Sequence, residues 1–230
     1  MRRIAILITL FSFLPLLSQE TDLPTLQVVD SLYREDQFYI GITYNMISQQ
    51  PKELEHNKVS LGFSIGFLRD MPFNEKRTWS VAAGLGYSVN TSNQNLLIDK
   101  AGDQYNYSYF PSNLSYDKNK LILNYIDLPI ELRWRTSTYE SHRFWRIYTG
   151  FKLSYLFHDT YKFRSDDGDR TITNNPDLNK IQYGAYLAMG YNTWNFYAYY
   201  GINPMYKSAE VNAEKLDPHI LNLGLMFYIL

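Results

Sequence analysis

Apolar and polar residues alternate with a period of two along most of the chain from Gln37 onward. Each alternating segment has one predominantly apolar face, which is typical of a β-strand that separates two environments. No helical periodicity of useful length competes with this pattern. The alternation predicts eight strands, at about 37–46, 58–68, 77–90, a segment containing 125–135, 145–157, 181–191, 194–202 and 221–229.

The connections between the predicted strands alternate between long and short. The short ones lie at 70–76, 136–141 and 192–195, and the long ones at about 47–57, 91–118, 159–179 and 203–219. The long connections are polar and rich in Asn, Asp, Ser and Tyr, so we expect exposed loops. Alternating loop lengths are typical of up-and-down barrels of the bacterial outer membrane, whose short turns face the periplasm.

Glycine and charge indicate which face of the strands points inward. Ten of the twelve glycines fall in the predicted strands, and all ten lie opposite the apolar face. An eight-stranded barrel is just wide enough inside for side chains, so small residues belong there. Apart from Arg77 at the first position of its span, no Asp, Glu, Lys or Arg lies on the apolar face of the predicted strands. We therefore expect an all-β, eight-stranded antiparallel transmembrane barrel; a soluble, lipocalin-like barrel would require the inverse pattern.

The inward face of YIDLPIELRWR (125–135) and of the next strand is charged. If a seven-residue hinge joins the two strands, paired residue numbers sum to 279 or 277. At 279 Asp127 faces Lys152 and Glu131 lies diagonal to Arg146; at 277 Glu131 faces Arg146 directly. We interpret the set as a salt-bridge network that fills the lumen, because unpaired charge inside is costly; an ion path or a proton-handling site is the alternative. Pro129 cannot donate a ladder hydrogen bond, which predicts a bulge there. The predicted lumen charge network comprises Asp127, Glu131, Arg133, Arg135, Arg146 and Lys152.

Two further patterns concern insertion into the membrane. All four tryptophans lie on the outward face beside a short turn, which predicts an aromatic girdle at the periplasmic rim: Trp79, Trp134, Trp145 and Trp194. The last strand carries a polar-x-Gly-x-x-apolar-x-apolar pattern, thought to be the insertion signal read by the barrel assembly machinery: Asn222, Gly224, Phe227 and Ile229.

The N-terminal segment predicts export. Two arginines precede a short apolar run and the small residue Ser18, as in a secretory signal peptide at 1–18. A retained transmembrane anchor is the alternative, although the run is short for a span. We expect a flexible periplasmic leader at 19–36 and the barrel at 37–230.

Composition narrows the chemistry. The formal net charge is −1, so nucleic acid is not an expected partner. There is no cysteine and the four histidines show no ligand spacing, so we expect no metal site and no cofactor. His158, with Ser154 and Asp159 nearby in sequence, is the one candidate for a lipid-modifying triad; we expect no catalytic site. The 21 tyrosines suit surfaces that are half apolar and half wet.

Several stretches resemble the PorT (also called SprT) outer-membrane proteins of the Bacteroidota. They are RDMPFNE (69–75), YIDLPIELRWRTSTYESHRFWRIYTGFKLSY (125–155), NTWNFYAYYGINP (192–204) and NLGLMFYIL (222–230). The resemblance implies a role in type IX protein secretion and, in gliding species, gliding motility, without catalysis. Its implied partners are outer-membrane lipid, the barrel assembly machinery and other type IX secretion components. A small-solute outer-membrane channel and a lipid-modifying barrel enzyme are the alternative functions.

Overall fold

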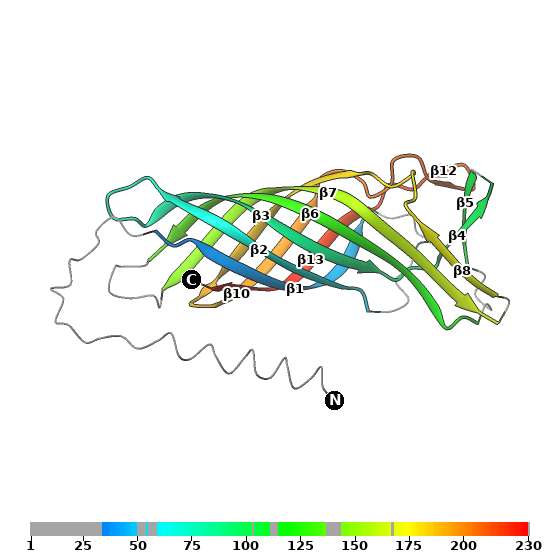
Figure 1. The fold of residues 1–230 in the computed structure, drawn as a ribbon, viewed down its shortest axis with the longest axis horizontal. Coiled ribbons are helices and arrows are strands. Elements are labelled where there is room, and N and C mark those ends of the chain that lie inside the picture. Colours follow the sequence, from blue (N-terminus) through cyan, green and yellow to red (C-terminus); the bar gives the residue numbers. More distant parts are fainter. Residues whose placement is uncertain are drawn as a thin grey trace, which may run out of the picture. The chain divides into compact units, whose positions relative to one another are not determined.

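Eight antiparallel strands form a closed hydrogen-bonded ring within the described part of the chain (Figure 1), which confirms the predicted fold class. Each strand pairs with its neighbours in the ring, and β1 pairs with β13 to close it. The strands are β1 (Gln37–Ser48), β2 (Leu61–Pro72), β3 (Trp79–Ser92), β6 (Lys118–Arg135), β7 (Trp145–Ser165), β9 (Ile181–Tyr191), β10 (Trp194–Gly201) and β13 (His219–Ile229).

The computed structural model describes residues 34–49, 54, 59–102, 104–110, 115–136, 144–166 and 168–229. The predicted signal peptide and most of the predicted leader therefore lie outside the described residues. The described part contains no helix long and apolar enough to span a membrane.

The faces of the ring follow the predicted alternation. Apolar side chains such as Ile130, 56% exposed, and Leu85, 58% exposed, point outward. The glycines leave space for large inward residues: a Cβ on Gly66 would lie 2.6 Å from the ring of Tyr39. The ring of Tyr186 lies over Gly150 and that of Tyr199 over Gly184 in the same way. The narrow interior is thus filled by tyrosines that pack against glycine backbones.

Strands β6 and β7 extend well past the others on the side of the long connections, the loop side. They contain 18 and 21 residues, whereas a tilted strand needs about 9–11 to span a bilayer. β8 (Gly168–Thr173) pairs with the end of β7 and widens this extension. The prediction of a loop at 159–179 is therefore wrong for its first half.

A β-bulge at Phe157 explains why the alternation of apolar and polar residues does not predict this extension. Tyr125 pairs with Leu156 and Asn124 with His158, so Phe157 is the extra residue of β7. A one-residue slip moves every following side chain to the other face. Inward positions of β7 are even-numbered up to Leu156, whereas the buried residues beyond the bulge are Asp159, Tyr161 and Phe163.

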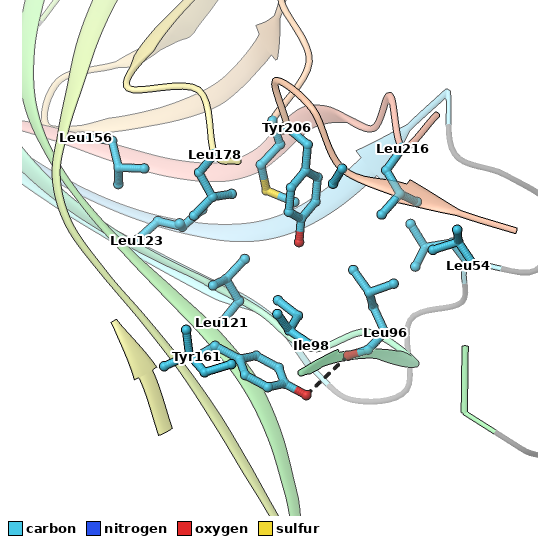
Figure 2. Packing of buried hydrophobic residues seen from close by; sticks show 14 of the residues in the cluster. Leu54, Leu96, Ile98, Leu121, Leu123, Leu156, Tyr161, Leu178, Tyr206 and Leu216 are labelled. Atoms are coloured by element: carbon cyan, nitrogen blue, oxygen red, sulfur yellow. Dashed lines mark hydrogen bonds between the residues drawn. The ribbon is translucent and has the colours of Figure 1, made fainter. Parts of the chain in front are cut away.

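The long connections at 91–118 and 203–219 also contain strands. They are β4 (Leu96–Ala101), β5 (Gln104–Tyr109), β11 (Glu210–Val211) and β12 (Glu214–Lys215), which gather at one end of the ring with β8 (Figure 1). We call the segments 93–110, 168–180 and 202–218 the cap. The expectation of exposed polar loops is wrong here, because the cap buries an apolar cluster against the ends of β6 and β7 (Figure 2). The buried members include Leu54, Leu96, Ile98, Leu121, Leu123, Leu156, Tyr161, Leu178, Tyr206 and Leu216.

The cap segment 202–218 covers the loop-side end of the lumen. Met205 lines a cavity of about 20 Å³ together with Asn45, Asn90 and Leu123, which come from β1, β3 and β6. Nδ2 of Asn179 donates to the carbonyl of Pro204 at 2.8 Å and to that of Tyr206 at 3.2 Å. These bonds join segment 202–218 to the end of segment 168–180, just before β9 begins.

Candidate functional site

The six predicted lumen charges all point inward, in two groups and one separate arginine. Arg133, Arg135, Asp127, Glu131 and Arg146 are buried, and the Lys152 side chain is 12% exposed. Within a narrow ring such charges require partners, because an isolated buried ion is strongly unfavourable.

Asp70 is the centre of the group near the short turns, the turn side. Its Oδ1 accepts from Oγ of Ser80 at 2.7 Å and from Nη1 of Arg133 at 3.2 Å. Its Oδ2 accepts from Nη2 of Arg135 at 2.9 Å, and Nε of Arg133 also donates to Glu131 at 2.7 Å. Asp70 is absent from the predicted lumen network because the predicted turn at 70–76 includes it; continuing the alternation of β2 past Leu68 places it inward.

Tyrosines from facing strands complete this group. Oε1 of Glu131 accepts from the hydroxyl of Tyr186 at 2.8 Å and from that of Tyr228 at 3.2 Å. The guanidinium of Arg133 lies 4.7 Å from the ring centre of Tyr148, within the range of a cation–π interaction. Glu131 on β6 is thereby connected to β9 and β13 across the lumen, which accounts for part of the high tyrosine content.

The last residues of the predicted leader contact the same group. A carboxylate oxygen of Glu35 lies 3.5 Å from Nη1 of Arg135, and its backbone N–H donates to Asp70 at 3.3 Å. Asp36 lies 3.4 Å from Arg69. Residues 35 and 36 are therefore part of the turn-side end of the barrel.

The second group lies midway along the lumen. Asp127 is 3.7 Å from Nζ of Lys152 and accepts from the hydroxyl of Ser154 at 2.5 Å. The ammonium of Lys152 also lies 4.5 Å from the ring centre of Tyr199. A cavity of about 20 Å³ beside these residues has room for about one water molecule, so the lumen is filled along this stretch.

The pairing of β6 with β7 corrects both predicted registers. Glu131 pairs with Gly150 and Pro129 with Lys152, so residue numbers sum to 281 instead of 277 or 279. The cause is a connection of nine residues, 136–144, in place of the seven-residue hinge. Asp127 is accordingly diagonal to Lys152. Nor does Pro129 form a bulge: the β3–β6 ladder is interrupted opposite it, as a missing N–H requires.

Arg146 lies outside both groups. It pairs with Arg135 in the ladder, not with Glu131 as one register predicted. Its guanidinium lies 4.5 Å from the ring centre of Phe144 and 5.7 Å from those of Tyr148 and Tyr228. Among the described residues it forms no ion pair, so aromatic faces are its main neighbours.

The tryptophans form an arc around the turn-side rim. Trp79 pairs with Trp134 across β3 and β6. The ring centre of Trp145 lies 5.4 Å from that of Tyr191, and Trp194 lies 4.8 Å from Phe227. In β13, Asn222 and Gly224 face inward whereas Phe227 and Ile229 face outward. Recognition of this strand by the assembly machinery stays a prediction.

The three candidate catalytic residues do not come together. Ser154 is bonded to Asp127 inside the lumen, and Asp159 is held by the N–H of Asn175 at 2.9 Å. The bulge turns His158 to the other face, where Nε2 lies 3.1 Å from Oγ1 of Thr160. No group of three or more His, Asp or Glu side chains suited to a metal occurs among the described residues.

A polar network connects the cap segments. The hydroxyl of Tyr107 donates to Asp177 at 2.9 Å and accepts from Nδ2 of Asn175 at 2.8 Å. Ser208 donates to the other oxygen of Asp177 at 2.7 Å. Burial raises the pKa of the Tyr107 phenol and the charge of Asp177 adds to the effect, so the phenol keeps its proton and acts as donor.

A closed antiparallel ring with an apolar outside and a charged, filled inside defines a membrane-spanning β-barrel of the outer-membrane type. Residues 18–207 match the family described as "Outer membrane protein beta-barrel domain". The chain belongs to this family, and it is an outer-membrane protein.

No curated protein matches the chain. The crystal structure of Ail, the attachment invasion locus protein of Yersinia pestis, is 15% identical, with 84% of this chain and 99% of that chain covered and a TM-score of 0.36. A structure described under "Asymmetric conductivity of engineered proteins" is 9% identical, with 86% and 100% covered and a TM-score of 0.22.

Proposed function

We propose that this outer-membrane β-barrel is an accessory or assembly component of type IX protein secretion, and that it acts by binding partner proteins without catalysis. The observation that supports a binding role is the filled lumen, where ion pairs and tyrosines leave a cavity of only about 20 Å³. A ring of this size cannot pass a folded protein. The barrel then provides an anchor in the membrane and a binding surface at each end.

The resemblance to the PorT family supports the turn side as the partner surface. The resembling stretches cover the turn at 69–75, the turn-side parts of β6 and β7, the β9–β10 turn and β13. None of them contains a strand of the cap. Phe73, 63% exposed, stands at the first of these turns and is the residue we propose for direct partner contact. The turn side is expected to face the periplasm.

Deletion of the gene in its host tests the role. We expect the culture medium to lose proteins that carry a C-terminal sorting domain, as measured by quantitative mass spectrometry of secreted proteins. Wild-type protein and Val59→Ala, which truncates an exposed apolar residue on the loop side, should restore export. Phe73→Ala should restore it only in part while inserting normally. Unchanged export after deletion would refute the secretion role.

The alternative functions give different outcomes. For a small-solute channel, single-channel recording of the reconstituted protein would show reproducible conductance steps; we expect none, because side chains fill the lumen. For a lipid-modifying enzyme, His158→Ala would change the envelope lipids; we expect an unchanged lipid profile, since His158 and Ser154 point to opposite faces.

A further inference from the structure

The bulge at Phe157 also decides which side chains of the β6–β7 extension point outward. Beyond it, Lys162 and Arg164 are exposed on the outer face, whereas Phe163 is buried in the cap. β6 continues its own alternation and presents Lys118 and Lys120 on the same face. Lys120 pairs with Lys162 and Lys118 with Arg164, so four cations occupy neighbouring positions on one surface.

The fold neutralises this surface only in part. Like charges directly opposite each other in a ladder destabilise a sheet. Asp169 on β8 lies 3.0 Å from Nε of Arg164, and both side chains are about 60% exposed. Across the described ranges, Lys118, Lys120 and Lys162 form no ion pair. Asp117 and Asp166 are also exposed, at the tip of the extension beyond the Lys118–Arg164 pair. Within the β6–β7 ladder itself, the charged residues of the outer face are all cations, which favours an external anion.

The surface continues the lipid-facing side of the barrel. Ile126 pairs with Tyr155, and they are 40% and 53% exposed on that side. Lys120 lies six residues beyond Ile126 on β6. That is about 20 Å along the strand, or about 14 Å along the membrane normal for a tilt of about 45°. Lysine side chains bend back toward the interface by several ångströms. The cations thus lie at the level of the lipid headgroups of the outer leaflet.

We propose that Lys118, Lys120, Lys162 and Arg164 form a binding site for the phosphate groups of outer-leaflet lipids. Charge complementarity and continuity with the lipid-facing surface both support this occupant. Bound phosphates offset the repulsion between the paired cations and fix the height of the extension, and with it the cap, above the bilayer. This inference does not depend on the proposed role in secretion.

Native mass spectrometry of the full chain in a neutral detergent tests the site. The probes are phosphatidic acid and phosphatidylcholine with the same acyl chains. We expect the wild type to retain phosphatidic acid preferentially and the double variant K120Q/K162Q to bind it about 30-fold more weakly, from about 1 kcal/mol per charge. Phosphatidylcholine binding should not change. Lys207→Gln, an exposed lysine elsewhere on the cap, is the matched control and should behave as wild type.

Three outcomes would overturn the proposal. The first is equal retention of phosphatidic acid by K120Q/K162Q and wild type. The second is displacement of the lipid by inorganic phosphate at the same concentration, since the site would then recognise a free anion. The third is a lower melting temperature of the double variant in lipid-free detergent, because the lysines would then be structural. We expect an equal or higher melting temperature, since the variant removes a like-charge pair.

Discussion

The lumen and the cap bury side chains by opposite means. The lumen holds arginines, carboxylates and tyrosines in ion pairs such as Asp70 with Arg135 at 2.9 Å. The cap is built on leucines and aromatic residues, with Leu178 and Leu216 among its buried members. One region is specified by directional polar contacts and the other by apolar burial, although the same two strands, β6 and β7, contribute side chains to both.

This difference follows from what surrounds each region: lipid surrounds the ring, whereas water surrounds the cap. The ring has lipid outside, so its polar side chains have only the lumen to occupy, and each buried charge requires a partner there. The cap extends beyond the bilayer, where its outer surface can be polar and its inside apolar, as in a soluble domain. At the bulge in β7, the apolar face of the strand therefore changes from the outside of the barrel to the inside.

The largest expected effect comes from removing the centre of the lumen network. Asp70→Ala leaves the buried Arg133 and Arg135 without their shared carboxylate, and losing one member of a buried ion pair costs about 3–5 kcal/mol. We expect the variant to unfold at a clearly lower urea concentration than wild type. Unfolding is measured by the difference in gel mobility between the folded and the unfolded barrel.

Arg69→Ala is the matched control for this variant. It breaks the neighbouring pair with Asp36, in which the Arg69 side chain is 55% exposed. Exposed pairs contribute about 0–1 kcal/mol. If the two variants unfold at the same urea concentration, the interior network does not stabilise the ring and the contrast with the cap is lost.

A substitution that destabilises the cap should leave the stability of the barrel unchanged. Leu178→Ala removes a fully buried side chain, which costs about 2–5 kcal/mol locally. We expect faster limited proteolysis within 168–180 and 202–218, with barrel unfolding unchanged. Leu187→Ala, on the lipid-facing surface at 41% exposure, should leave proteolysis as in wild type. A parallel loss of barrel stability in Leu178→Ala would show that the two regions fold as one unit.

Alternation predicts the ring because each side chain of a ring strand points either into the lumen or toward the lipid. It therefore orients Asp127, Arg133 and all four tryptophans correctly, while the register of β6 and β7 depends on where each strand ends, which alternation does not define. The same limit explains Asp70, two residues past the predicted end of β2. Beyond Phe157 the pattern YKFRSDDGDRTIT still alternates around an Asp-Gly turn signal, but with reversed faces.

The cap is harder to predict for a different reason. Leu96, Leu178 and Leu216 come from separate segments, and each segment is too short to show a clear period. Their burial depends on contacts among several chain segments at once, with no ring to fix their directions. A hairpin signal is present at LLIDKAGDQYNYSY, where Gly102 has a positive φ of 63°.

A smaller effect is expected where tyrosine and glycine share space in the lumen. A Cβ on Gly86 would collide with the hydroxyl of Tyr39. Gly86→Ala should therefore cost about 1–3 kcal/mol, and Tyr39→Phe should recover part of the loss in the double variant. Gly201→Ala, whose Cβ would lie 3.4 Å from its nearest neighbour, is the control that should unfold close to wild type. If the losses of unfolding free energy in the two single variants add up in the double variant, then contacts other than the Tyr39 hydroxyl oppose a side chain at position 86.

The smallest effect concerns the few polar contacts of the cap. Tyr107→Phe keeps the ring, which packs 5.7 Å from that of Tyr206, and removes both hydroxyl bonds. A typical hydrogen bond contributes about 1 kcal/mol, so the loss of two should accelerate proteolysis of the cap by about 30-fold at most, less than in Leu178→Ala. Ser208→Ala, which removes the exposed second donor to Asp177, should have less effect still. If Tyr107→Phe opens the cap as much as Leu178→Ala does, then polar contacts hold the cap as they hold the lumen, and the two regions share one mode of stabilisation.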